Sequence, residues 1–185
     1  MEKLCNAKCT ALQKAMRKLG EQLDREDISR PFIEVIPGKL VCSYRPLRRH
    51  HNPDFRGAQV NLPADAAPEV LEWIDKVRAG GIQAIISLMG PSELGHYAAV
   101  CSKLGAADLY DLYKSHGFTV EPIPWEDPKY RVSQGGRSYK DTLLEVRQKA
   151  LEAFDKLGTP VLLHCSSGIQ RSSPVAAFIY AHRCN

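Results

Sequence analysis

The sequence has 185 residues, of which 44% are hydrophobic and 25% are charged, and its formal net charge is +4. This length and composition suffice for one globular domain with its own core, and no internal repeat or low-complexity tract interrupts the chain. No apolar run reaches membrane-spanning length, and the N-terminus lacks the continuous hydrophobic stretch of a secretory signal. We therefore expect a protein that has no membrane span and works in the cytoplasm.

The six cysteines show no paired Cys-x2-Cys spacing of the kind that holds zinc. A reducing compartment also disfavours structural disulfides. The sequence therefore predicts free thiols and no metal.

The N-terminal segment is predicted to be an amphipathic helix, because its apolar residues fall on one helical stripe with lysines and arginines opposite. The pattern breaks over residues 24–31, so we divide the chain into an N-terminal helix and linker (1–30) and a main domain (31–185). We expect the helix to pack against the domain; a substrate-recognition element and an organelle transit segment are the alternatives. The stripe consists of Leu4, Leu12, Met16, Leu19 and Leu23.

The next segments predict a strand hairpin at 32–44 around Pro37-Gly38 and a helix at 68–78. Gly80-Gly81 then leads into an apolar strand at 82–88, which we interpret as internal and parallel.

Helical patterns at 97–104 and 110–116 precede a strand at 118–123. A long amphipathic helix follows at 138–157, closed by Gly158. Strands that alternate with helices predict an α/β fold, in which helices flank a central, mostly parallel sheet and the site lies at the carboxyl ends of the strands.

The most informative segment follows a short apolar strand at 161–163, where the chain continues His-Cys-Ser-Ser-Gly-Ile-Gln-Arg-Ser-Ser-Pro. Pro174 suits the first turn of a helix, so Cys165 to Arg171 forms a strand-to-helix loop. Backbone N–H groups of such a loop and the helix N-terminus suit a phosphate dianion, and the same field stabilises the thiolate of Cys165. Arg171 adds a planar fork for two phosphate oxygens, and Gly168 allows the backbone to curl closely around the anion. The alternative for Cys165 alone is a buried, inert thiol.

This pattern resembles the signature of the cysteine-dependent protein phosphatases of the protein tyrosine phosphatase superfamily: His-Cys, five residues, Arg, then Ser or Thr. The short loops and compact length are more similar to the dual-specificity branch than to the tyrosine-specific domains. The resemblance covers residues 32–183 and is strongest at 160–174. The matching positions are His164, Cys165, Gly168, Arg171 and Ser172.

A carboxylic acid on a separate loop usually protonates the leaving group in this chemistry. Trp125-Glu126-Asp127 is similar to the family's acid loop, in which a tryptophan precedes an aspartate, and the resemblance favours Asp127 as the general acid. Glu126 is the competing candidate, because the order Trp-Glu-Asp leaves the register open. The non-catalytic alternative for the pair is a solvated turn.

The resemblance implies a two-step reaction without metal or cofactor. Cys165 attacks phosphorus, Asp127 protonates the leaving group, and water hydrolyses the phosphocysteine while the Ser172 hydroxyl stabilises the departing thiolate. His164 is expected to orient the loop through a buried hydrogen bond, which differs little from an ordinary core histidine. The groups that bind phosphate are expected to be those of Ser166, Ser167, Gly168, Ile169, Gln170 and Arg171.

The five residues inside the loop are uncharged, which favours a phosphorylated protein over a phosphoinositide as the substrate. RNA 5′-phosphatases share the signature, but the chain lacks the interleaved aromatic and basic residues that stack bases, so we do not expect a nucleic-acid substrate. A basic cluster offers a site for an acidic substrate, or is a solvated loop. The cluster is Arg45, Arg48, Arg49, His50 and His51.

Two other classes remain as alternatives: a phosphate-binding module without turnover, and a rhodanese-like sulfurtransferase, which lacks the full signature. Low-molecular-weight phosphatases carry their cysteine loop near the N-terminus, so chain order argues against them. Members of the resembled family usually have further helices after the signature helix. We therefore expect either that the N-terminal helix covers the surface left bare or that the chain is truncated.

Overall fold

The computed structural model describes residues 2–126 and 138–184. Helix α1 (Glu2–Leu23) leads into the hairpin of β1 (Phe32–Ile36) and β2 (Leu40–Ser43), as predicted. The remaining elements are η1 (Ala64–Ala66), α2 (Ala67–Ala79), β3 (Ala84–Ser87), α3 (Pro91–Leu94), η2 (Gly95–Tyr97), α4 (Ala98–Lys103), α5 (Leu109–Ser115), β4 (Thr119–Pro122), α6 (Tyr139–Lys156), β5 (Val161–His164) and α7 (Ser172–Arg183).

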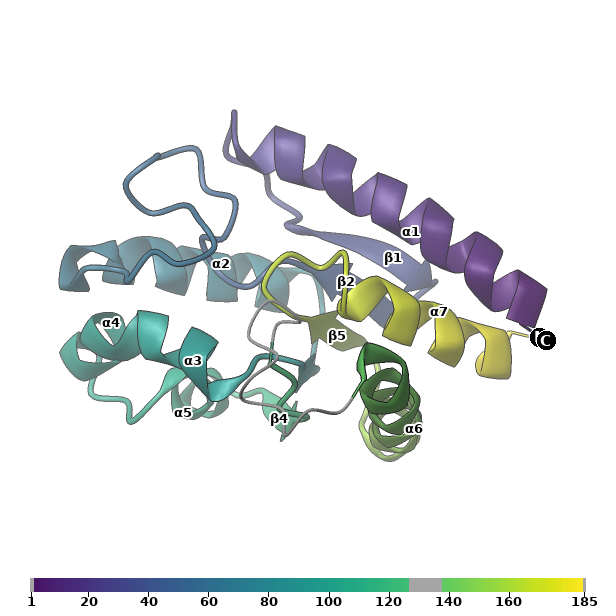
Figure 1. Cartoon of the computed structure of the whole chain (residues 1–185). Helices are drawn as coiled ribbons and strands as arrows, with labels where there is room; N and C mark the ends of the chain where they lie inside the picture. Colours follow the sequence, from purple (N-terminus) through teal and green to yellow (C-terminus); the bar gives the residue numbers. More distant parts are fainter. Residues whose placement is uncertain (1, 127–137, 185) are drawn as a thin grey trace.

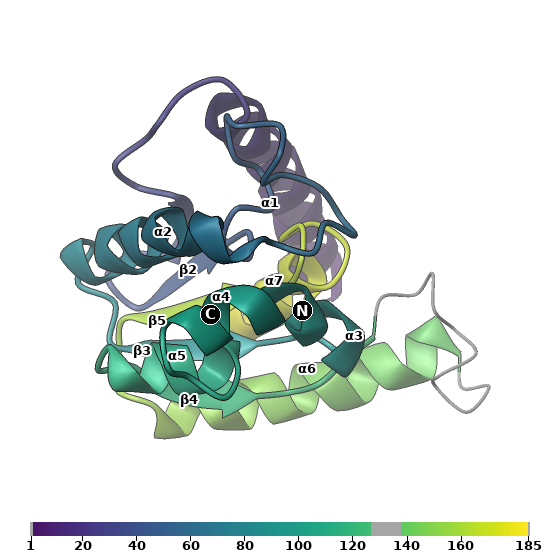
Figure 2. The same ribbon diagram turned by 90° about the vertical axis from the view of Figure 1, so that its left-hand side faces the viewer.

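The described strands form one sheet of five in the order β1-β2-β5-β3-β4, which confirms the predicted α/β class with a mostly parallel sheet. Only the β1–β2 pair is antiparallel; β2–β5, β5–β3 and β3–β4 are parallel. Figure 2 shows β2, β5, β3 and β4 in this order from top to bottom. His164 is in register with Ser43 on one side and Ser87 on the other, so the carboxyl ends of three strands meet at one edge.

Helices cover both faces of the sheet. Successive strand residues point to opposite faces, so each buried strand contributes apolar side chains to a core on either side. One core cluster joins α1, α6 and α7 to side chains such as Leu163, and the other joins α2, α4 and α5 to side chains such as Leu162. No helix in the described ranges is both long enough and apolar enough to cross a bilayer.

Helix α1 packs against α7, as expected from its apolar stripe (Figure 1). Leu12, Met16 and Leu19 are buried, whereas Leu4 and Leu23 lie at the edge of the contact. Burial of side chains of this size contributes about 1.5–3 kcal/mol each, enough to hold the helix on the domain. The N-terminal helix therefore belongs to the packed core.

Candidate active site

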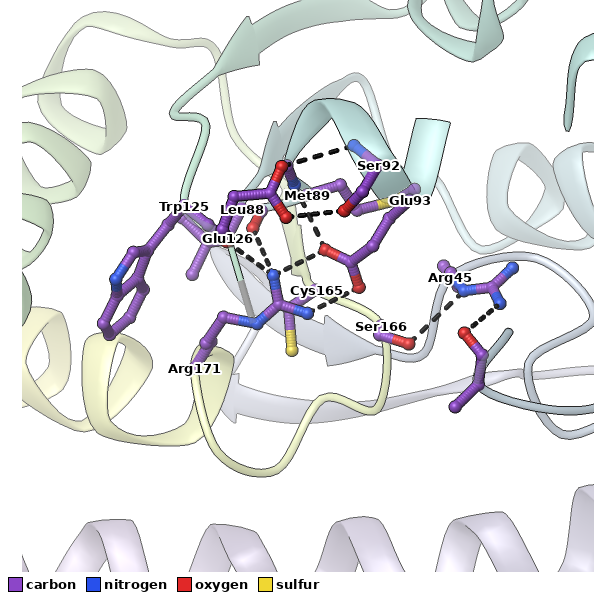
Figure 3. Close-up of polar contacts among 12 residues, drawn as sticks. Arg45, Leu88, Met89, Ser92, Glu93, Trp125, Glu126, Cys165, Ser166 and Arg171 are labelled. Carbon is purple, nitrogen blue, oxygen red and sulfur yellow. Dashed lines mark hydrogen bonds and ion pairs between the residues drawn. The ribbon is translucent and has the colours of Figure 1, made fainter. Parts of the chain in front are cut away.

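Residues 165–171, which we call the cysteine loop, connect β5 to α7 at the edge where the carboxyl ends of β2, β5 and β3 meet. Cys165 is 1% exposed, and its sulfur points into the ring that the loop forms (Figure 3). The backbone N–H of Gly168 donates a hydrogen bond to Cys165 Sγ at 3.2 Å. An N–H group directed at sulfur stabilises the thiolate over the thiol.

Carbonyl oxygens of the cysteine loop are held by donors outside it. A carbonyl oxygen that accepts a hydrogen bond from outside the loop is not directed at the centre of the ring, where it would repel an anion. Backbone N–H groups can then face the centre and bind an anion there. The donors are Arg45 N for Ser166 O (3.2 Å), Ser173 Oγ for Gly168 O (2.8 Å) and Tyr139 Oη for Gln170 O (2.7 Å).

The backbone of the loop approaches its neighbours closely at Gly168. The φ of this glycine is +64°, and a Cβ atom there would collide with Met16 Cε and lie 2.8 Å from Ser43 O. Glycine is required because only a residue without Cβ adopts this conformation at so close an approach. The backbone therefore turns sharply at Gly168, and α1 supplies part of the surface against which it packs.

Arg171 is 1% exposed and forms a two-pronged ion pair with Glu93. Its Nη1 lies 2.6 Å from Glu93 Oε2, and its Nη2 lies 2.6 Å from Glu93 Oε1. Nη1 also donates to the carbonyl oxygens of Leu88 (3.0 Å) and Trp125 (2.6 Å). The guanidinium is thus fixed in place by contacts within the protein.

Glu93 is an ion-pair partner that stays charged. Burial raises the pKa of its carboxyl, but hydrogen bonds and charge from Arg171 outweigh burial, and the Gly90 N–H and the charge of Arg45 add to them. The resulting pKa lies below the ordinary value for glutamate. Glu93 therefore neutralises the charge of Arg171 over the physiological pH range.

The segment before the predicted acid is anchored on both sides. The Trp125 ring stacks on Tyr139 of α6 with centroids 5.4 Å apart. Glu126 accepts hydrogen bonds from Ser92 N (3.2 Å) and Ser92 Oγ (2.6 Å) at the start of α3. A Cβ at Gly90 would collide with the Glu126 carboxylate, so this approach also depends on glycine. The bonds to Ser92 give Glu126 an anchoring role.

Asp127, the favoured general acid, lies outside the described residues. Of the two carboxylates that the sequence left open, Glu126 directs both oxygens at Ser92.

His164 is fully buried at the end of β5, and its Nδ1 lies 3.3 Å from Cys165 O. Burial lowers its pKa to about 4, so the imidazole is neutral at physiological pH. The predicted buried hydrogen bond is present. Ser172, the first residue of α7, is also fully buried, and its Oγ lacks a hydrogen-bond partner among the described residues.

The predicted basic cluster does not form a uniform exposed patch. Arg45 is 2% exposed, and Arg49 pairs with Asp24 at 2.6 Å. Of the predicted phosphate-binding positions, Ser166 is buried, Ser167 and Ile169 are half-buried, and Gln170 is exposed.

Sequence reasoning missed Glu93 and Arg45 as parts of the site. A signal for Glu93 was present, since Gly-Pro-Ser-Glu begins one residue after the predicted strand 82–88 and Pro91 occupies the first position of α3. Carboxyl ends of parallel strands meet at one edge, which places this glutamate beside the cysteine loop.

No group of three or more His, Cys, Asp or Glu side chains suited to a metal ion occurs within the described ranges. Comparison of the sequence with models of known protein families and with curated proteins gives no match.

Proposed function

We propose that the chain is a cysteine-dependent phosphatase, similar in fold to the dual-specificity branch of the protein tyrosine phosphatase superfamily. The observation that carries the proposal is the hydrogen bond from Gly168 N–H to Cys165 Sγ, inside a loop that ends at a buried arginine. The Gly168 N–H, the N-terminus of α7 and Arg171 together suit a phosphate next to a thiolate.

In the first step the Cys165 thiolate attacks phosphorus in line and the ester bond breaks. Asp127 gives its proton to the departing oxygen, and the loop N–H groups and Arg171 hold the equatorial oxygens. In the second step Asp127 takes a proton from water, which attacks the phosphocysteine and releases phosphate. The buried Ser172 hydroxyl, which has no other partner among the described residues, donates to the thiolate as it leaves.

A phosphorylated protein is the favoured substrate, because the side chains at 166–170 carry no charge that would select a multiply phosphorylated ring. A phosphoinositide and an RNA 5′-phosphate are the alternatives for the same chemistry.

The test is hydrolysis of a small aryl phosphate across pH without added metal. We expect Cys165→Ser to abolish turnover. Asp127→Asn should reduce turnover and remove the basic limb of the pH profile, because a protonated acid is required. Glu126→Gln is the matched control and should keep that limb.

Wild-type protein that binds inorganic phosphate without hydrolysing any ester would refute the proposal and identify a phosphate-binding module. Loss of the basic limb in Glu126→Gln instead of Asp127→Asn would reassign the general acid. Preference among phosphopeptides, a soluble inositol phosphate and a 5′-phosphorylated RNA then decides the substrate class.

A further inference from the structure

Arg45 is a buried cation beside the cysteine loop, contributed by the segment that follows β2. Its backbone N–H donates to Ser166 O at 3.2 Å, and its Nε lies 3.3 Å from Ser166 Oγ (Figure 3). Main chain and side chain of one residue thus hold the same loop position. Ser166 directly follows the nucleophile, so its orientation decides where the next backbone N–H points.

The hydrogen-bond partners of the Arg45 guanidinium that lie in the described ranges are all neutral. Nη1 donates to Tyr97 Oη at 2.8 Å, and Nη2 lies 2.9 Å from Gly57 O and 3.3 Å from Ala58 O. No carboxylate lies within ion-pair distance of Arg45 among the residues that the structure describes. Buried charges usually have an opposite partner, because an uncompensated one is costly.

The charge balance of the site makes this arrangement informative. Glu93 cancels the charge of Arg171, so those two groups together bring no net charge to a bound anion. Arg45 is then a buried cation that has no carboxylate at ion-pair distance within the described part of the chain. A thiolate or a phosphate in the cysteine loop is the counter-charge that such an arginine lacks.

The charge of Arg45 acts on groups around the site. The pKa of His164 is lowered first by burial, and the charges of Arg171 and Arg45 lower it further. Other titratable groups that experience this charge are Arg48, Glu93, His96, Tyr97 and Tyr113. Cys42, Tyr44 and Tyr139 experience the charge of Cys165.

We propose that Arg45 is a second cation of the phosphate site: a positioning residue that fixes Ser166 and supplies positive charge to the anion in the cysteine loop. The inference rests on the proposed role of this loop as the phosphate site. It assigns Arg45 to the support of the cysteine loop instead of to a surface that selects acidic substrates.

The test compares Arg45→Met, which removes the charge, with Arg45→Lys, which keeps the charge but lacks the planar guanidinium and its several donors. Arg56→Met is the matched control, because it removes the same charge from an exposed position of the same segment. Two quantities are measured: inorganic phosphate affinity by calorimetry, and the pH midpoint of thiolate formation by ultraviolet absorbance, as a difference from the same protein carrying Cys165→Ser. Neither requires turnover.

We expect Arg45→Met to weaken phosphate binding about tenfold and to raise the measured midpoint of thiolate formation, because a positive charge beside the cysteine loop is lost. Arg45→Lys should keep the midpoint while binding phosphate several-fold more weakly, because the second contact to Ser166 is lost. Arg56→Met should change neither quantity by more than about twofold.

A folded Arg45→Met variant with wild-type affinity and midpoint would overturn the inference, as would equal losses in Arg56→Met. Lower thermal stability alone, with both quantities unchanged, would reduce Arg45 to a structural role. If Arg45→Met does not fold, Arg45→Lys decides: unchanged phosphate affinity in that variant overturns the inference.

Failure of the proposed function gives a different pattern. Wild-type protein that binds phosphate in an Arg45-dependent way but hydrolyses no ester would refute the phosphatase and leave this inference standing. Hydrolysis that does not change when Arg45 is replaced would support the phosphatase and refute the inference about Arg45. Wild-type protein that binds no phosphate would refute both.

Discussion

The buried ion pair between Glu93 and Arg171 predicts a large effect from removing the carboxylate. Both side chains are nearly inaccessible, at 5% and 2% exposure, so Glu93→Ala leaves a buried guanidinium without its counter-charge. Breaking such a pair from one side costs about 3–5 kcal/mol. The carbonyl oxygens of Leu88 and Trp125 still accept from Arg171, so we expect a loss of about 3 kcal/mol, near the lower limit.

Glu93→Gln separates charge from shape. The amide keeps one acceptor for Arg171 but loses the charge, and we expect a loss of about 1.5–3 kcal/mol, the range for a hydrogen bond to a charged group. If the proposed function holds, turnover should fall in both variants, because the guanidinium is no longer held in place beside the cysteine loop. Glu121→Gln, at an exposed carboxylate on β4, is the control and should stay within about 0.5 kcal/mol of wild type.

Urea unfolding with linear extrapolation measures these differences directly. If Glu93→Ala loses less than about 1 kcal/mol, the ion pair does not stabilise the buried arginine and the reasoning is wrong. Normal turnover in a folded Glu93→Ala variant would equally show that the carboxylate does not position Arg171.

Three further predictions concern the cysteine loop and the strands beside it. Burial lowers the folded-state pKa of His164 to about 4, so the unfolded chain binds more protons below pH ~6.5, and the free energy of unfolding should fall by about 3 kcal/mol as the pH drops to 4. In His164→Asn, urea unfolding at a series of pH values should show a correspondingly smaller fall, and a fall as large as in wild type would contradict the prediction. Gly168→Ala should lower the free energy of unfolding by about 1–3 kcal/mol and remove most of the turnover, because a Cβ would collide with Met16. Wild-type kinetics in this variant would contradict the close approach of Met16 to the loop. Burial and the nearby charge of Cys165 raise the pKa of the Cys42 thiol, so mass spectrometry after brief iodoacetamide treatment at neutral pH should find Cys42 unmodified, and rapid labelling would refute its burial.

Local patterns predicted most of the fold. The apolar stripe of the first helix, the Pro-Gly turn of the hairpin and the short apolar run before Cys165 each have a period or a turn residue that depends only on neighbours in sequence. The cysteine loop could be predicted in the same way, because the strand before it, its glycine and the start of the next helix lie within one short segment.

The partners of the loop could not be predicted by these means. Glu93 reaches Arg171 only because β3 lies next to β5, a pairing that no local pattern specifies. Arg45 was assigned to a basic cluster for an acidic substrate, because arginine is mostly exposed in proteins. Its burial follows from the β2–β5 pairing, which brings Arg45 N to Ser166 O.

The contact between Met16 and Gly168 has a consequence for synthesis of the chain. The first helix emerges early from the ribosome, while the loop that it supports is translated far later. Contacts between such distant segments slow folding, because a long stretch of chain must be ordered before they form. Until then the apolar stripe of the helix is exposed to aggregation or to a chaperone. The nascent chain is therefore expected to complete the cysteine loop, with its support from α1, only at the end of folding.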